Sequence, residues 1–131
     1  MAMEEVRALV FDDDPDDRER IIKWLERLEV GIQVVGTAKT RLGALELCSE
    51  PRLRELEIRL VATDGNLTLG DASGADGRQI VAAIRETDLP IRVVAVTASP
   101  VDDGVDVHCT KAQIRDSEFS KKLSRMMKSW W

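Results

Sequence analysis

Four short apolar runs in this chain each lead toward a polar side chain, and this pattern constrains the fold most. The runs lie at residues 8–11, 60–63, 93–96 and, less purely apolar, 105–108. They are followed by Asp12 and Asp13, by Asp64, by Thr97 and, a few residues on, by Lys111. Runs that are almost continuously apolar are typical of strands buried on both faces of a parallel sheet. Because ligands of such sheets bind beyond the carboxyl ends of the strands, these polar side chains are predicted to meet.

Amphipathic segments alternate with the apolar runs. We expect strands at residues 7–11, 32–35, 58–63, 91–96 and 105–108, and helices over about fourteen residues from Pro15, at 40–49, from 76 onward and at 114–127. Asp14 is placed to cap the first helix, and Asp16 and Asp17 suit the positive end of its dipole. Pro51 is expected to end the second helix, with a short turn at 52–56. This alternation predicts an α/β fold: a doubly wound parallel sheet with helices on both faces, formed by residues 1–131 as one domain.

The composition excludes several classes of partner. The net charge is −5 and the basic residues form no stripe, which argues against nucleic-acid binding. No apolar stretch approaches the length of a membrane span, and the first residues do not form a signal peptide. Cys48 and Cys109 share no metal-ligand spacing, so we expect them as reduced thiols in the core. These features predict a cytosolic protein.

Three carboxylates at one edge of a sheet need a partner of opposite charge. Asp12, Asp13 and Asp64 would repel one another unless a cation neutralised them. Carboxylate oxygens suit Mg²⁺, which binds one or two carboxylates and keeps several waters. Lys111 and Thr97 beside such a cation indicate a phosphoryl group as the ligand.

The same residues, taken in order, resemble those of a receiver domain of the two-component response-regulator family, over nearly the whole chain. Asp12 and Asp13 match the acidic pair after the first strand, and Asp64 matches the phosphoacceptor after the third. Thr97 matches the hydroxyl after the fourth strand, and Lys111 matches the lysine after the fifth. The resemblance implies a flavodoxin-like, five-stranded sheet with strand order 2-1-3-4-5. It also implies a phosphoacceptor signalling domain rather than an enzyme.

The resemblance assigns roles to the residues that match. Asp64 would accept a phosphoryl group from a phosphohistidine of a sensor histidine kinase or a phosphotransfer protein. Lys111 would pair with Asp64 and then with a phosphoryl oxygen, and Thr97 would donate a hydrogen bond to another oxygen, coupling phosphorylation to a conformational shift.

Mg²⁺ would be the cofactor of this reaction. The carboxylates of Asp13 and Asp64 would bind it directly, and Asp12 would act partly through a water molecule. The backbone carbonyl of Asn66 would complete the protein ligands. By contrast, Asp14 is expected to cap a helix rather than to bind the metal.

Two segments differ in length from the family's pattern. Only seven residues separate Thr97 from Val105. Fully extended, they reach roughly 23 Å, which is enough to return along a short strand but not to hold a helix. We therefore expect the family's fourth helix to be missing or reduced to a turn. The loop from Asp64 to Gly77 is longer than the family's.

Two residues near Lys111 also depart from the pattern. Ala112 replaces the proline that usually follows the lysine, and a cis bond without proline costs about 2.5–4 kcal/mol. The sequence therefore predicts no cis bond that would orient the Lys111 side chain. His108 stands where a switch tyrosine or phenylalanine is usual, and we expect a ring packed at the strand end.

The shortened crossover bears on the output of the domain. Without a fourth helix, the fifth strand and the last helix would expose apolar surface. Trp130 and Trp131 follow the last helix, where they either fold back as a frayed tail or contact a partner. We expect this face, with the two tryptophans, to be covered by a second copy of the chain or by an output partner.

Two other functions remain open. A receiver-like interaction module would keep the pocket without being phosphorylated, which the short crossover and Ala112 favour. A haloacid-dehalogenase-like phosphohydrolase would use Asp12 as its nucleophile. That class expects a different residue at Pro15 and an acidic pair after the last strand, which this sequence lacks.

Overall fold

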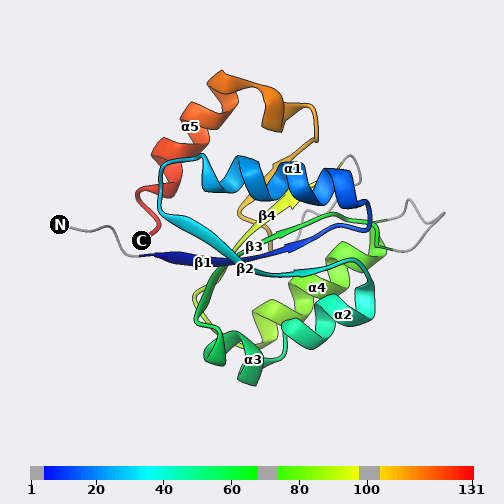
Figure 1. The fold of residues 1–131 in the computed structure, drawn as a ribbon. Helices are drawn as coiled ribbons and strands as arrows, with labels where there is room; N and C mark the ends of the chain where they lie inside the picture. Colours follow the sequence, from blue (N-terminus) through cyan, green and yellow to red (C-terminus); the bar gives the residue numbers. More distant parts are fainter. Residues whose placement is uncertain (1–4, 68–73, 98–103) are drawn as a thin grey trace.

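The computed structural model describes residues 5–67, 74–97 and 104–131 as a five-stranded parallel sheet between two layers of helices (Figure 1). The strands are β1 (Val6–Phe11), β2 (Ile32–Ala38), β3 (Ile58–Thr63), β4 (Arg92–Val96) and β5 (Val107–Cys109). Their spatial order is β2-β1-β3-β4-β5, and all neighbouring pairs are parallel. The predicted fold class and strand order are confirmed.

Helices cover both faces of the sheet (Figure 1). On one face, α1 (Pro15–Glu26) and α5 (Ser117–Met127) pack over a core that includes Ile21, Leu25 and Met127. On the other face, α2 (Arg41–Leu47), α3 (Glu50–Glu55) and α4 (Ala75–Glu86) enclose a second core that includes Leu53 and Ile80. Two separate apolar clusters are the expected result of a sheet buried on both sides. None of the helices in the described ranges is long and apolar enough to cross a membrane.

The first helix begins as its sequence predicts. Asp14 is the N-cap, and its side chain accepts hydrogen bonds from the backbone N–H groups of Asp16 and Asp17. Farther along α1, the indole Nε1 of Trp24 donates to the Ser120 hydroxyl at 2.9 Å. This bond links α1 to α5 and satisfies the polar atom of a buried tryptophan.

Several predicted element bounds are corrected. The expected helix at 40–49 ends at Leu47, and Pro51 does not terminate it but lies in the first turn of α3, where a proline needs no N–H partner. The last helix starts at Ser117 with Asp116 as N-cap, because residues 113–115 form a separate 3-10 turn. Strand β2 continues past residue 35 to Ala38. A Cβ at Gly36 would lie 2.8 Å from Leu9 Cδ2, so a larger residue at this position, beside the register shift of β1, would require the Leu9 side chain to move.

The return from β4 to β5 is held by an arginine of α4. Arg85 donates to the carbonyl of Gly104 at 2.9 Å and to the carbonyl of Ile91 at 2.6 Å, and it pairs with Asp106 at 3.0 Å. Gly104 has a φ of +81°, and a Cβ there would lie 2.8 Å from Val81 Cγ1. Within the described residues no helix lies between β4 and β5, and the prediction for residues 98–103 falls outside them.

Asp106 also corrects the start of the fifth strand, which the sequence placed at 105. Its backbone N–H donates to the Val93 carbonyl, while its side chain accepts from the Val93 N–H at 2.7 Å and from Arg92 at 3.1 Å. The carboxylate thus replaces one rung of the ladder, and β5 runs only from Val107 to Cys109. Cys109 and Cys48 are free and buried, as predicted.

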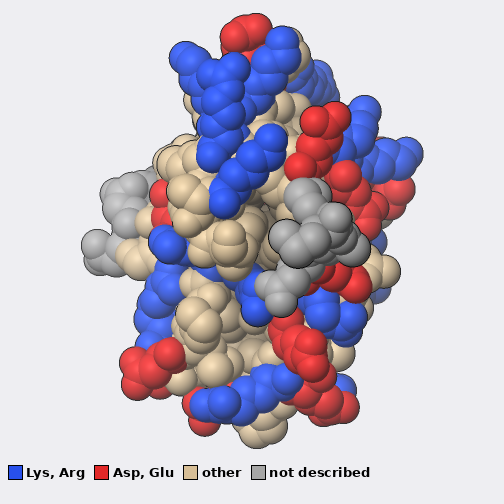
Figure 2. All heavy atoms as spheres, turned by 90° about the vertical axis from the view of Figure 1, so that its left-hand side faces the viewer, with Lys and Arg blue, Asp and Glu red and all other residues tan. Residues whose placement is uncertain are grey.

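The two C-terminal tryptophans lie at the amino ends of the strands, opposite the end that carries Asp64. Trp130 packs against the core on the α1–α5 face, and the guanidinium of Arg92 stacks over its ring at 5.2 Å. The rings of Trp130 and Trp131 meet edge to face at 5.5 Å. The start of β1 and the C-terminus lie on this side (Figure 1), and in Figure 2 acidic side chains interrupt the basic ones across it. The expected second copy or output partner at this face stays a prediction.

Candidate functional site

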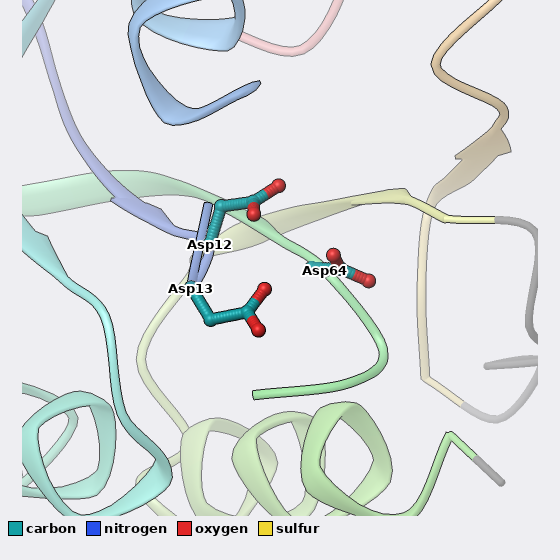
Figure 3. A group of neighbouring side chains, drawn as sticks. All are labelled: Asp12, Asp13 and Asp64. Atoms are coloured by element: carbon teal, nitrogen blue, oxygen red, sulfur yellow. The ribbon is translucent and has the colours of Figure 1, made fainter. Parts of the chain in front are cut away.

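Three aspartates meet at the carboxyl ends of β1 and β3 (Figure 3). Asp12 and Asp13 follow β1, and Asp64 follows β3. One carboxylate oxygen from each lies within 4.8 Å of the others. Asp12 and Asp64 are buried, whereas Asp13 is exposed. The backbone N–H of Asp64 bonds to the carbonyl of Phe11 at 2.9 Å, so the parallel ladder itself sets the two strand ends side by side.

Lys111, from the segment after β5, points into this acidic group. Its ammonium lies 2.6 Å from Asp12 Oδ2, 2.9 Å from Asp17 Oδ2 and 3.1 Å from Asp64 Oδ2. The pairing with Asp64 was expected, but the pairings with Asp12 and Asp17 were not. All described peptide bonds are trans, and Lys111 reaches the site with Ala112 in place of proline.

Burial and ion pairing shift the pKa values of Asp12 and Lys111 in opposite directions. Burial raises the pKa of Asp12 to about 6, although hydrogen bonds from Lys111 and from the backbone of Asp14 lower it. Burial also opposes the charge of Lys111, but its hydrogen bonds to Asp12 and Asp17 outweigh burial and raise its pKa above the usual range. Both shifts leave Asp12 ionised and Lys111 protonated at neutral pH, which is the charge state that the close contacts require.

The raised pKa of Asp12 predicts a pH dependence of folding in the absence of metal. Between the ordinary value of 3.8 and about 6, the folded state binds a proton that the unfolded state has released. The contribution of Asp12 to stability must therefore fall as pH rises through this window, by on the order of 2 kcal/mol. Urea unfolding in EDTA at about pH 4.5 and pH 7 measures this, with Asp12→Asn, which cannot titrate, as the reference. Parallel losses in both proteins would contradict the assignment.

Asn66 and Thr97 lie where the sequence places them, at the ends of β3 and β4. The backbone N–H of Asn66 donates to Asp64 Oδ1 at 3.2 Å, and its side-chain oxygen accepts from the N–H of Gly74. These bonds hold the start of the loop after β3 against Asp64. Thr97 is buried, and its backbone N–H bonds to the carbonyl of Cys109 at 2.8 Å. Thr97 thus ties the ends of β4 and β5 together.

His108 is not the packed ring that we expected. It is exposed on the edge strand β5, and its Nε2 donates to the carbonyl of Thr97 at 2.8 Å. The bond requires a proton on Nε2, because a carbonyl can only accept. His108 therefore contacts the backbone of Thr97 from the solvent-exposed edge of the sheet.

Asp17 is the site residue that sequence reasoning missed. It was interpreted only as a favourable charge in the first turn of α1. Ninety-four positions separate it from Lys111, and no motif links the two. Only the packing of α1 beside the strand ends brings them together.

The chain was compared with known proteins. No family model matches it. The transcriptional regulatory protein NarL of Mycobacterium tuberculosis is 35% identical over 97 residues, which are 72% of this chain and 39% of NarL. The chain therefore spans well under half the length of this relative.

Solved structures extend the similarity to nearly the whole chain. The signal receiver domain of the response regulator NarL from Mycobacterium tuberculosis has a TM-score of 0.66 and 25% identity, with 97% of both chains covered. The response regulator RcsB from Salmonella typhimurium has a TM-score of 0.72 and 21% identity, covering 97% of this chain and 62% of RcsB, which shows a shared fold. The response regulator domain of CheB from Thermotoga maritima shares the fold likewise, with a TM-score of 0.63, 20% identity and coverage of 96% and 92%. With its strand order and the acidic pair at its expected place, the chain belongs to the receiver domains of response regulators.

Proposed function

We propose that this receiver domain accepts a phosphoryl group on Asp64 in a Mg²⁺-dependent reaction, and that the donor is a phosphohistidine of a sensor histidine kinase or a phosphotransfer protein. One observation carries the proposal: three carboxylates from two strand ends converge within 4.8 Å, with the ammonium of Lys111 beside them. Converging carboxylates are costly unless they bind a cation, and an ammonium next to them suits a phosphoryl oxygen.

The residues present fit a magnesium ion. Asp12, Asp13 and Asp64 offer hard oxygen ligands from a cluster that is partly buried and partly open to water. Such a set suits an ion that takes one or two carboxylates and keeps several waters. The backbone carbonyl of Asn66 would add a fourth protein oxygen. When bound, Mg²⁺ supplies positive charge against the oxygens of the transferred phosphoryl group.

The protein's own groups would act by position and charge. A carboxylate oxygen of Asp64 forms a bond to phosphorus, while the bond from phosphorus to the donor nitrogen breaks and its electron pair leaves with the imidazole. Lys111, already 3.1 Å from Asp64, would balance the charge on a phosphoryl oxygen. Thr97, at the end of β4, would donate a hydrogen bond to another.

Magnesium binding predicts a gain in stability that depends on Asp13. Mg²⁺ at ten times its dissociation constant should stabilise the folded domain by about 1.4 kcal/mol, because the ion binds only the folded site. Asp13→Ala removes an exposed ligand without opening the core, so most of this gain should disappear. Thermal unfolding with and without Mg²⁺ checks this, with the exposed Asp16→Ala as the matched loss of charge. An unchanged Mg²⁺ response in Asp13→Ala would rule out a metal at this position.

The proposed function is tested by mass spectrometry of the wild type after incubation with acetyl phosphate and Mg²⁺. We expect one phosphoryl group, on Asp64. Steady hydrolysis of the donor with label on Asp12 would instead indicate a phosphohydrolase. No reaction at all, with Mg²⁺ bound, would indicate a receiver-like interaction module that is not phosphorylated.

A further inference from the structure

Lys111 has no donor to spare for a phosphoryl group. An ammonium carries three N–H donors, and three carboxylates surround it at 2.6, 2.9 and 3.1 Å. Two of them, Asp12 and Asp64, come from the strand ends. The third, Asp17, comes from the first turn of α1. If Lys111 is to bind a phosphoryl oxygen, as the proposed function requires, at least one of these carboxylates must leave it.

The three carboxylates differ in how easily they can leave. The side chain of Asp12 is fully buried, and without Lys111 it would lose its positive partner and keep a backbone N–H of Asp14 as a neutral donor. Asp64, whose side chain is 11% exposed, is the carboxylate that would accept the phosphoryl group, so it stays beside Lys111. Asp17 is 27% exposed and therefore solvated in part. Its release costs least.

Asp17 also has a second partner in place. Its Oδ1 accepts from Arg20 Nη1 at 3.2 Å, while its Oδ2 accepts from Lys111. Arg20 lies three positions along α1, where side chains share one face of the helix, and it is largely exposed. A small rotation of the Asp17 carboxylate can break its bond to Lys111 and leave both of its oxygens free to pair with Arg20.

We propose that Asp17 is a positioning residue that holds Lys111 in the unphosphorylated domain and yields its place to a phosphoryl oxygen when Asp64 is phosphorylated. This inference rests on the proposed function. With acetyl phosphate as donor, an Asp64 oxygen bonds to phosphorus and the bond from phosphorus to the acetate oxygen breaks. Acetate leaves with the electron pair. Asp17 then pairs with Arg20, and Lys111 keeps three partners.

The inference predicts opposite effects for the two partners of Asp17. In Asp17→Asn, Lys111 is released from a competing charge, so phosphorylation by acetyl phosphate should be faster by about five-fold. In Arg20→Gln, Asp17 loses its alternative partner and stays on Lys111, so phosphorylation should be slower by a similar factor. Asp16→Asn changes the charge of α1 as Asp17→Asn does, and Lys23→Gln changes it as Arg20→Gln does. Neither control side chain contacts Lys111 or Asp17, so both variants should be phosphorylated at the rate of the wild type.

A spectroscopic measurement tests the contact without phosphorylation. In the metal-free wild type, the Lys111 ammonium should exchange its protons with water slowly, and its nitrogen resonance should be visible by NMR. Exchange should become several-fold faster in Asp17→Asn and stay as in the wild type in Asp16→Asn.

The outcomes separate this inference from the proposed function. If the wild type is phosphorylated and Asp17→Asn reacts at the rate of Asp16→Asn, or more slowly, Asp17 has no such role. If Asp17→Asn fails to fold, an Arg20→Gln rate equal to that of Lys23→Gln overturns the inference equally. If no protein in the series is phosphorylated although Lys111 exchange responds to Asp17→Asn, the proposed function fails and the exchange of partners fails with it.

Discussion

Asp64→Asn should take up no phosphoryl group from acetyl phosphate and Mg²⁺. The side-chain amide has nearly the size of the carboxylate but lacks the charged oxygen that attacks phosphorus. The Asn66 N–H can still donate to the remaining oxygen, so the loop after β3 should keep its place. The substitution also removes one of three crowded negative charges, so we do not expect the fold to be lost. Intact-protein mass spectrometry measures the effect as the disappearance of the phosphoryl adduct.

The control for this experiment is Asp16→Asn. Asp16 is an exposed aspartate in the first turn of α1. The Asp16→Asn protein should be phosphorylated to the same extent as the wild type. An adduct that persists in Asp64→Asn would place the phosphoacceptor elsewhere. Peptide mapping would then decide between Asp12 and Asp13, the remaining carboxylates of the cluster.

Asp106→Ala should lower the free energy of unfolding by about 3 kcal/mol, because one carboxylate accepts three hydrogen bonds, two of them from charged groups. The Asp106 carboxylate accepts from Arg85 at 3.0 Å, from Arg92 at 3.1 Å and from the Val93 N–H at 2.7 Å. Alanine leaves two guanidinium groups and one backbone donor without this acceptor. These bonds hold β5 on the sheet where no described helix supports the crossover from β4.

Urea unfolding gives the free energy directly, and Glu86→Ala serves as the reference. Glu86 is an exposed residue at the end of α4, and its replacement should change stability by no more than about 0.5 kcal/mol. Asp106→Asn should fall between alanine and the wild type, because it keeps one acceptor oxygen but not the charge. A loss below about 1 kcal/mol in Asp106→Ala would mean that the arginines find other partners.

The layout of the sheet was predictable from the sequence because its strands are buried on both faces. Such strands must be apolar almost throughout, so β3 matches its predicted range at both ends. The polar residue after each run marks the strand end, and parallel pairing then brings Asp12 and Asp64 together. These inferences need only local pattern and the geometry of a parallel sheet.

Element ends were less predictable where a side chain takes over a backbone hydrogen bond. The fifth strand begins later than its apolar pattern suggests because the Asp106 carboxylate accepts from Val93 in place of a carbonyl. Pro51 was interpreted as a stop signal, yet a proline that is disfavoured inside one helix is well placed in the first turn of the next. The same residue type allows both outcomes, and the surrounding packing selects one.

The carboxylates of the cluster and Lys111 were identified from the sequence, but the partners of Lys111 were not. Strand ends are placed by backbone hydrogen bonds, which repeat and can be counted along the chain. Asp17 reaches Lys111 because α1 packs across β1 at one particular rotation, which its apolar face and the Trp24–Ser120 bond set together. That rotation depends on contacts between residues far apart in the chain. Only the tertiary structure therefore decides that a helix charge becomes part of the site.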